Sequence, residues 1–586
     1  MDQGPTITLG EATTYFRAVA VDFDGTLADG EVAPDTLAAV NEVRRHGVQV
    51  ILVTGRIMSE LQAVFPEVDD HVDAVVAENG ATVFTAAGVR ELAAPVDPAV
   101  SASLLARGVT NRQGQVLVAC AAADELAVLD VIRDLALDYR LVPNRGELMI
   151  LPSGVTKGAG LREALADLGL SPHNTLGIGD AENDHSLFDV CELVVAVANA
   201  VDPLRRDADL VLSLPDGEGV ADLLRGPVLS GRARIHSRRW QLTLGTEEAG
   251  DPVTIPASQL NIAVCGGTGD GKSYLTGLIS EQLIRLGYTL IIADPEGDHV
   301  GLGALHDVLI VGGSDRHLAE PAEIVRLLPY ATVVVDLSHM DAERRAGYAA
   351  TFPGEVEAAR AQTGIPQWVV LDEAHAPLGR HGRGLRAFNA SRKGYLLTTW
   401  RPEELAADAL ASLDAVITLT SPEPGANAID LTAAVADTSR ERIAELLAGP
   451  TGRAVLAWRE RGGQPTLFTL AARSTPHLRH EHKYDQSGVE PARQFYFRTE
   501  SDTPTGATAA NLAELEAELV ICEPGVLRHH CPGRDFSRWI QDVFHDAQLA
   551  TDIAAAEARL PPGSLGAPVE RVRTALIAAL QRRQVR

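Results

Sequence analysis

The 586-residue sequence lacks long apolar runs and has few cysteines. No run approaches the ~18 to 20 uninterrupted apolar residues that span a bilayer, and the start lacks a basic segment followed by an apolar one. We therefore expect a cytoplasmic protein without a membrane partner. The five cysteines are mostly far apart, which excludes a dense disulfide framework and a CxxC metal ribbon.

Basic side chains are also in deficit, with 51 Lys+Arg against 79 Asp+Glu and a formal net charge of -28. This charge repels nucleic acid unless basic residues cluster locally, so a nucleic-acid partner is only weakly supported. The remaining composition is that of a globular protein, since 46% of residues are hydrophobic and 22% are charged. At ~150 residues per domain, this length predicts several domains.

The apolar runs divide the chain into four stretches. In residues 1–225, β-rich runs alternate with helical patterns, which predicts an α/β domain with a parallel sheet, and residues 81–151 interrupt it as an inserted α+β cap. Residues 226–255 open with Gly and Pro and are expected to be a linker or the first strand of the next domain. A second α/β series predicts another such domain in residues 256–475. Residues 476–586 are expected to form a small, mostly helical module.

The segment VAVDFDGTLAD places Asp22 and Asp24 at the end of a predicted strand. Residues two apart on a strand share one face, so we expect both carboxylates to converge on one substrate. Such a pair suits covalent phosphoryl transfer, in which one carboxylate attacks phosphorus while the other protonates the leaving oxygen and later activates water. A carboxylate approaches a phosphate only when a hard cation and a lysine offset the repulsion, which predicts Mg²⁺.

Residues for these supporting roles follow at later strand ends. Thr54 ends the second strand, Lys157 follows the cap, and strand TLGIGD ends at Asp180, with Asn183 and Asp184 close behind. The carboxyl ends of parallel strands gather ligands at one edge of the sheet. We therefore expect these side chains to meet the two aspartates.

With these motifs, residues 18–224 resemble the haloacid dehalogenase superfamily, specifically the Cof-like phosphatases with a cap inserted after the second motif. The resemblance implies that Asp22 is the nucleophile and Asp24 the general acid/base, with the Asp24 backbone carbonyl also serving as a metal ligand. The other roles it implies are phosphate binding by Thr54, Lys157 and Asn183, and magnesium binding by Asp22, Asp24, Asp180 and Asp184. A cap favours a phosphorylated small-molecule substrate, because its closure excludes bulk water.

A second phosphate site is predicted where strand LNIAVC runs into GGTGDGKS and then into a helical pattern. The glycines let backbone N–H groups wrap phosphates at a helix N-terminus, while Lys272 reaches the terminal phosphates and Ser273 binds Mg²⁺. The loop residues expected to bind ATP are Gly266, Thr268, Gly269, Gly271, Lys272 and Ser273.

Two later segments carry the residues expected to act on ATP. Strand WVVLDEAH ends in Asp372, expected to hold the magnesium shell through water, and Glu373, expected to orient and deprotonate the attacking water. This division favours hydrolysis over transfer to an acceptor. Arg392 precedes a strand that ends in Thr398 and Thr399, and we expect this arginine to bind ATP, as a finger that reaches the nucleotide of a neighbouring subunit.

Together with IIADPEGDH after the second strand, these segments resemble the HerA/FtsK-type P-loop ATPases over residues 239–472. The resemblance implies ATP hydrolysis in a ring-shaped homo-oligomer that often moves nucleic acid. Trp400 stands where many relatives carry glutamine, and few basic residues are available to line a channel. ATP hydrolysis is therefore the stronger implication and translocation the weaker one.

The leading hypothesis is a bifunctional Mg²⁺-dependent phosphatase and ATPase. One alternative is a nucleic-acid end-processing enzyme, because polynucleotide kinase-phosphatases have the same domain order. Another is an ATP-dependent switch or assembly protein whose first domain chiefly binds a phosphorylated ligand.

The C-terminal stretch contains metal-capable side chains whose spacing fits no usual zinc finger. We expect them to lie in solvated polar loops or to act as capping and hydrogen-bonded groups. They are His477, His480, His482, His529, His530 and Cys531.

Overall fold

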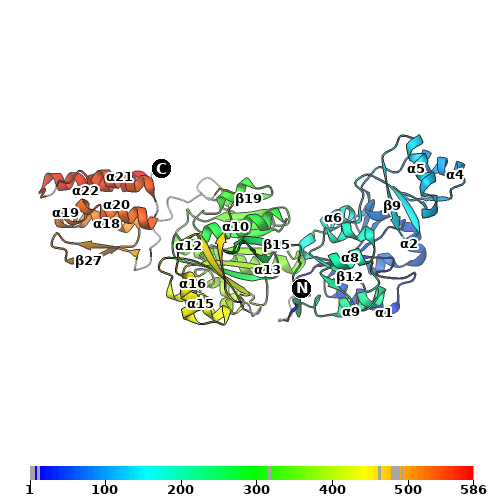
Figure 1. Ribbon diagram of the computed structural model, residues 1–586, viewed down its shortest axis with the longest axis horizontal. Coiled ribbons are helices and arrows are strands. Elements are labelled where there is room, and N and C mark those ends of the chain that lie inside the picture. The colour runs from blue at the N-terminus through cyan, green and yellow to red at the C-terminus, as the bar shows by residue number, and fades with distance from the viewer. Residues whose placement is uncertain are drawn as a thin grey trace.

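The computed structural model describes residues 7–9, 14–144, 146–313, 318–459, 464–476, 489, 493–544, 546–561 and 563–584. An α/β domain with its cap, a second α/β domain and a mostly helical module follow one another along the longest axis (Figure 1). The predicted fold class is confirmed. Within the described ranges, no helix is both long enough and apolar enough to cross a membrane.

The first domain is built on an eight-stranded sheet in the order β13-β12-β11-β2-β3-β4-β5-β6. Its central strands are parallel and buried, as expected for a sheet with helices on both faces. The strands are β2 (Ala18–Asp22), β3 (Gln49–Val53), β4 (Ala74–Ala77), β5 (Thr82–Thr85), β6 (Gly88–Glu91), β11 (Thr175–Gly179), β12 (Leu193–Ala196) and β13 (Leu210–Val211). The helices are α1 (Pro34–Arg45), α2 (Met58–Val64), α3 (Val68–His71), α6 (Lys157–Asp167), α7 (His185–Phe188), α8 (Asp202–Asp207) and α9 (Asp216–Arg225).

The cap is a four-stranded antiparallel sheet in the order β7-β8-β10-β9 with two helices. It begins later than predicted, because β5 and β6 belong to the large sheet. Glu78 and Asn79 adopt positive φ and turn the chain back, so that β5 pairs antiparallel with β4. The cap elements are α4 (Pro98–Ala106), β7 (Asn111–Gln113), β8 (Val118–Ala121), α5 (Glu125–Asp134), β9 (Tyr139–Asn144) and β10 (Glu147–Pro152).

The second domain has an eleven-stranded sheet in the order β16-β15-β25-β24-β23-β17-β22-β21-β18-β20-β19. The strands are β15 (Gln241–Thr246), β16 (Pro252–Pro256), β17 (Asn261–Cys265), β18 (Leu290–Asp294), β19 (Val308–Gly312), β20 (Thr332–Asp336), β21 (Trp368–Leu371), β22 (Tyr395–Thr399), β23 (Ala415–Leu419), β24 (Arg453–Trp458) and β25 (Thr466–Leu470). The helices are α10 (Lys272–Arg285), α11 (Pro321–Val325), α12 (Ala342–Ala349), α13 (Phe352–Thr363), α14 (Ala407–Ala411), α15 (Ala426–Ala436) and α16 (Arg440–Leu447).

Most of residues 226–255 is structured rather than a free linker. β15 and β16 form a hairpin that extends the large sheet, and β14 (Ala233–Ile235) pairs antiparallel with β1 (Ile7–Leu9). The alternation of buried and exposed residues in both hairpin strands matches a sheet edge with one solvated face.

The C-terminal module packs a hairpin, β26 (Phe495–Arg498) and β27 (Pro504–Ala509), against helices around an aromatic core. His530 uses both ring nitrogens: Nδ1 lies 2.8 Å from Asp535 Oδ2, and Nε2 accepts the Arg498 N–H at 2.9 Å. Burial raises the pKa of Cys531 to about 12. These groups are therefore core and hydrogen-bonding residues, whereas His477, His480 and His482 lie outside the described residues. The helices are α18 (Leu512–Ile521), α19 (Pro524–Gly533), α20 (Asp535–Trp539), α21 (Ala547–Glu557) and α22 (Ala567–Gln584).

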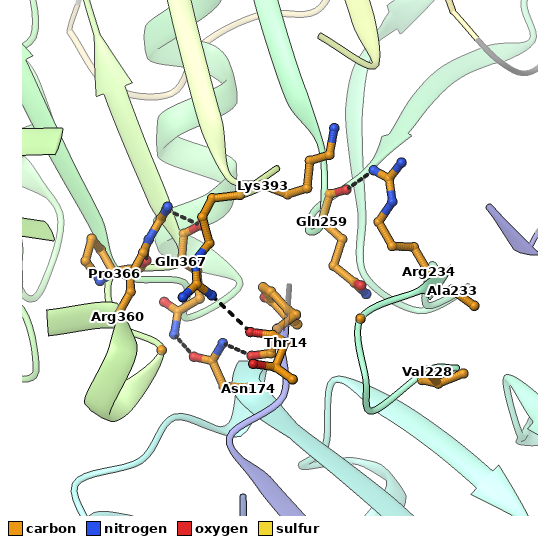
Figure 2. Close-up of a pocket in the computed structure, with 14 residues that line it drawn as sticks. Thr14, Asn174, Val228, Ala233, Arg234, Gln259, Arg360, Pro366, Gln367 and Lys393 are labelled. Carbon is orange, nitrogen blue, oxygen red and sulfur yellow. Dashed lines mark hydrogen bonds between the residues drawn. The ribbon is translucent and has the colours of Figure 1, made fainter. Parts of the chain in front are cut away.

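The two α/β domains meet through loops at the amino ends of their strands. Gln367, before β21, donates to the Asn174 side chain, before β11, at 2.9 Å (Figure 2). Arg17, before β2, donates to the Arg360 carbonyl at 2.9 Å, and His173 Nε2 lies 2.8 Å from the Leu286 carbonyl oxygen. The carboxyl ends of the two sheets, where open α/β sheets bind ligands, therefore face away from this seam.

Candidate active sites

The carboxyl edge of the first sheet carries a buried cluster of carboxylates. Asp22 ends β2, while Asp180 and Asp184 follow β11, and one carboxylate oxygen of each lies within 4.8 Å of the others. Lys157, the first residue of α6, donates from Nζ to Asp22 at 2.6 Å and to Asp184 at 2.7 Å. The structure thus brings together four of the residues predicted from the separate motifs.

The electrostatics of this cluster indicate a cation site. Burial raises the pKa of Asp22 well above its usual range; Lys157 opposes this effect, and the charges of Asp184 and Asp180 add to it. Burial works to lower the pKa of Lys157, yet the Asp184 and Asp22 carboxylates raise it above its ordinary value. Three carboxylates against one ammonium leave an excess of negative charge among oxygen donors. Such a donor set fits a hard divalent cation such as Mg²⁺.

Two further predicted phosphate-binding residues lie close to the cluster. Thr54 follows β3 and is buried, and its hydroxyl oxygen accepts the Arg56 N–H at 3.1 Å. Asn183 lies between Asp180 and Asp184 and donates to the Asn79 side chain at 3.4 Å. Hydroxyl and amide groups at these positions can hydrogen-bond phosphate oxygens.

Asp24 lies two residues after Asp22 and is paired with Arg56. Both of its oxygens accept from the Arg56 guanidinium, with the shortest contact at 2.6 Å. The hydrogen bond with Asp24 raises the pKa of Arg56, and the Asp22 charge adds to this effect, so the guanidinium feels both aspartates. β2 ends at Asp22, and the chain turns at Gly25, which has φ 80. The convergence of Asp22 and Asp24 on one substrate stays a prediction.

The cap is tied to the first domain beside this cluster. Glu78 accepts the backbone N–H groups of Gln115, Val116 and Leu117 at 2.7, 2.8 and 2.9 Å. Glu78 directly precedes Asn79, the partner of Asn183, so the cap loop is anchored one residue away from this pair. Sequence reasoning did not assign Glu78 a role, and its positive φ depends on tertiary contacts.

Gly80 sets the position of Lys157. It has φ +101, and a Cβ added there would lie 1.9 Å from the carbonyl oxygen of Thr156, the N-cap of α6. We expect Gly80→Ala to destabilise the first domain by about 3 kcal/mol, because backbone must move to relieve the clash. The phosphatase rate should also fall, because the clash displaces the backbone of Thr156 and Lys157.

Gly30→Ala is the matched control. Gly30 has φ +102 with nothing within 4 Å of an added Cβ, so it carries the same backbone strain without the clash. Calorimetric unfolding of both variants isolates the packing effect. Equal shifts of the same transition would show that Gly80 is needed only for its φ.

The second site is a phosphate loop between β17 and α10. Gly266, Gly269 and Gly271 all have positive φ, at 159, 87 and 109°, as a tight loop requires. Lys272 donates to the Gly267 carbonyl at 2.9 Å, and Ser273 donates to Asp298 at 2.6 Å. The lysine and serine thus lie at the N-terminus of α10, where backbone N–H groups favour anions.

The acidic pair after β21 lines the same cavity as Lys272 and Thr268. Asp372 Oδ2 lies 3.3 Å from His299 Nε2, and Glu373, with φ 51, lies 3.4 Å from His375 Nε2. Burial lowers the pKa of His375 to about 4, so its ring is neutral near pH 7. The neighbour of Glu373 at this position is therefore an uncharged ring.

Arg392 is not brought to this cavity. It lies before the amino end of β22, where it pairs with Glu357 at 3.0 Å and donates to the Thr14 carbonyl at 3.2 Å. The phosphate loop lies at the opposite, carboxyl edge of the sheet, because β22 runs parallel to β17. Arg392 therefore lies away from the phosphate loop of its own chain, and its role as a finger toward the ATP of a neighbouring subunit stays a prediction.

Two arginines that the sequence motifs do not mark also line the cavity. Arg401 follows the carboxyl end of β22 and stacks on Trp400 at 3.9 Å from the ring centroid, and Arg345 donates to the Pro295 carbonyl. The rule that ligands gather at carboxyl ends of strands would have identified Arg401. Asp298 accepts a hydrogen bond from Ser273, but in the sequence only its place in the DPEGD segment marks it.

Comparison with known proteins gives a match for each half. A profile of haloacid dehalogenase-like hydrolases matches residues 19–103 and 140–224, and one described as helicase HerA, central domain, matches residues 246–440. A phosphoglycolate phosphatase from Methanothermobacter thermautotrophicus is 32% identical over 218 residues, covering 36% of this chain and 97% of that protein. Another, from Archaeoglobus fulgidus, is 32% identical over 217 residues, covering 36% and 96%.

Among solved structures, a haloacid dehalogenase-like hydrolase from Bacteroides thetaiotaomicron is 16% identical. It covers 36% of this chain and 98% of that one, with a TM-score of 0.33.

Proposed function

We propose that this chain carries out two magnesium-assisted reactions. Its N-terminal part belongs to the haloacid dehalogenase-like hydrolases, and it is followed by a HerA-type P-loop ATPase domain. The first reaction is hydrolysis of a phosphomonoester through an aspartyl-phosphate, and the second is hydrolysis of ATP by direct attack of water. One observation carries the first: Lys157 lies between Asp22 and Asp184 in a buried carboxylate cluster.

In the first reaction, Asp22 Oδ attacks phosphorus, and the bond from phosphorus to the leaving oxygen breaks. For its role, the Asp24 carboxylate first separates from Arg56. Asp24 then supplies a proton to the leaving oxygen, and later it takes a proton from the water that hydrolyses the acylphosphate. Lys157, Thr54 and Asn183 bind the phosphate oxygens. Magnesium held by Asp22, Asp180 and the Asp24 carbonyl would screen charge between carboxylate and phosphate, with Asp184 orienting the site.

The substrate proposed for this site is a small phosphomonoester, with phosphoglycolate the first to test. Two relatives that this chain covers almost completely are phosphoglycolate phosphatases. Glu78, which directly precedes Asn79, holds the cap loop through three backbone N–H groups, and a cap anchored there favours a substrate small enough to be enclosed. A polymer end would have to displace this loop.

In the second reaction, the phosphate loop binds ATP, and Lys272 contacts the terminal phosphates. Glu373 takes a proton from the attacking water, and Asp372 and Ser273 would hold magnesium, which would offset the negative charge of the phosphates. Asp372 and Glu373 follow β21 and line the same cavity as Lys272. A carboxylate at this position suits deprotonation of water, which supports water as the acceptor of the γ-phosphate. Assembly into a homo-oligomer through this domain is part of the proposal.

Removal of divalent cations tests the phosphatase mechanism. We expect EDTA to lower phosphoglycolate hydrolysis at least about 100-fold, because the uncompensated carboxylates repel the substrate, and added Mg²⁺ to restore it. The measurement is phosphate release at fixed pH. A rate that survives chelation would contradict the cation site.

A substrate panel separates this proposal from nucleic-acid end processing. We expect kcat/KM for phosphoglycolate to exceed that for an end-phosphorylated oligonucleotide by at least about 100-fold, because the cap encloses the site. The assay compares phosphoglycolate, a sugar phosphate and the oligonucleotide under identical conditions. Preference for the oligonucleotide, or transfer of the γ-phosphate of ATP to its 5'-hydroxyl, would favour the end-processing alternative.

A further inference from the structure

An arginine of the C-terminal module, Arg493, contacts the phosphate loop. Arg493 donates from Nη1 to the Thr268 carbonyl at 2.7 Å, and its Nη2 lies 3.5 Å from Asp270 Oδ1 and 3.4 Å from Ser421 Oγ. Thr268 and Asp270 belong to the loop that precedes Lys272. Figure 1 shows the module beside the second domain, at the end away from the first domain.

The core of the module anchors the backbone of Arg493. Trp539 donates from Nε1 to the Arg493 carbonyl at 2.7 Å, and its ring packs edge-on against Phe495 and Phe544. A second contact lies alongside: a Cβ added to Gly269 would be 3.9 Å from the Val543 carbonyl oxygen. The packed core of the module therefore fixes the backbone of Arg493, and this fixed backbone places the guanidinium at the loop.

Asp270 explains why a cation is needed there. Its side chain is 3% exposed, and Oδ2 accepts the N–H of Gly267, a donor of the phosphate loop, at 2.7 Å. A buried carboxylate in this loop repels the phosphates of a nucleotide. The Arg493 guanidinium carries the opposite charge at the other carboxylate oxygen, so it reduces this repulsion while it fixes the loop backbone at Thr268.

We propose that Arg493 is a positioning residue of the nucleotide site, through which the C-terminal module offsets the charge of Asp270 and raises the affinity of the loop for nucleotide. The inference rests on the proposed binding of ATP by this loop. It gives residues 476–586 a role within the chain itself. The effect falls on binding rather than on the chemical step, because Arg493 contacts the loop that precedes Lys272 and not Glu373 itself.

The test measures the Kd of a fluorescent ATP analogue with Mg²⁺ on the full-length protein. We expect Arg493→Ala to raise the Kd about tenfold, the usual effect of losing a charged hydrogen bond. At saturating ATP, kcat should change much less. Arg498→Ala is the matched control, because Arg498 lies in the same module but pairs with the exposed Asp502 at 2.9 Å, and it should leave the Kd unchanged.

Charge rescue distinguishes this role from a merely structural one. Asp270→Asn keeps an oxygen for the Gly267 N–H but removes the charge, so in the Arg493→Ala background it should recover most of the lost affinity. Arg493→Lys, which keeps the charge, should weaken binding less than Arg493→Ala. A double variant as weak as Arg493→Ala alone would overturn the electrostatic role.

The outcomes also separate this inference from the proposed function. Wild-type protein that binds no nucleotide would remove the proposed ATPase function and the inference with it. Wild-type binding with an unchanged or lower Kd in Arg493→Ala would overturn the inference and leave the ATPase proposal standing. Phosphatase activity of each variant reports that the first domain has folded, and calorimetric unfolding reports on the module that carries the substitution.

Discussion

Asp22→Asn is expected to lower phosphomonoester hydrolysis at least about 10⁴-fold, because an amide oxygen cannot form the acylphosphate. The fold should survive the change. Burial raises the pKa of Asp22, which means that its charged form is costly in the folded protein, so a neutral amide should not lower the thermal midpoint. The measurement is phosphate release from phosphoglycolate together with calorimetry.

Asp29→Asn is the control for that variant. Asp29 lies on the same segment but is exposed, so its replacement should leave the rate within about twofold. ATP hydrolysis should persist in Asp22→Asn, because the two sites lie at carboxyl edges that face away from a shared seam. Residual phosphatase activity above 1% in Asp22→Asn would show that another group is the nucleophile.

Lys272→Ala is expected to lower ATP hydrolysis about 10³-fold, because the cation that contacts the terminal phosphates is lost in a water-poor site. Phosphoglycolate hydrolysis should be unaffected.

Glu373→Gln should separate nucleotide binding from hydrolysis, because the variant should still bind ATP but no longer hydrolyse it. Phosphate release from ATP and equilibrium binding are measured for both variants. Hydrolysis that persists in Lys272→Ala would place ATP turnover elsewhere in the chain.

The seam between the two domains decides how independent these reactions are. It is built from side chains at the amino ends of strands, where Asn174 meets Gln367 and Arg17 meets the Arg360 carbonyl. His173 stacks on Tyr288 with ring centroids 3.6 Å apart, and both contact Glu192. Because this seam separates the carboxyl edges, a product of one site has no short path to the other.

Much of the architecture was predictable because it depends on local patterns. Buried parallel strands are continuous apolar runs, such as AVAVD in β2 and WVVL in β21, and each carries its polar residue directly after the run. The phosphate loop needs glycines at fixed spacing for backbone reasons alone. The positions of Asp22, Asp180 and Lys272 at carboxyl edges follow from these patterns.

Other predictions depend on where a strand begins or ends. Strand alternation places Asp22 and Asp24 on one face, but β2 ends at Asp22, and the Asp24 carboxylate is paired with Arg56. Arg392 lies before the amino end of β22, away from the phosphate loop of its own chain, so its predicted role as a finger depends on how subunits are arranged. The start of the cap was placed too early because antiparallel β5 and β6 look like any other short strands.

Other features depend on contacts between residues far apart in sequence. Glu78 gains its role only because the cap loop returns to it, and Arg493 because the C-terminal module lies against the phosphate loop. No periodicity or motif marks such pairs. They follow from how packed units meet, which a single sequence does not reveal.

The most direct test of two separate phosphorus chemistries is acid-quench labelling with peptide mapping. Radiolabelled phosphoglycolate and γ-labelled ATP are each mixed with the protein, quenched within the first turnover, and the labelled peptide is identified. We expect the phosphomonoester to label the peptide that contains Asp22, and ATP to release its label as free phosphate without marking the chain. Label from ATP on Asp22, or no covalent label from the phosphomonoester, would contradict the account.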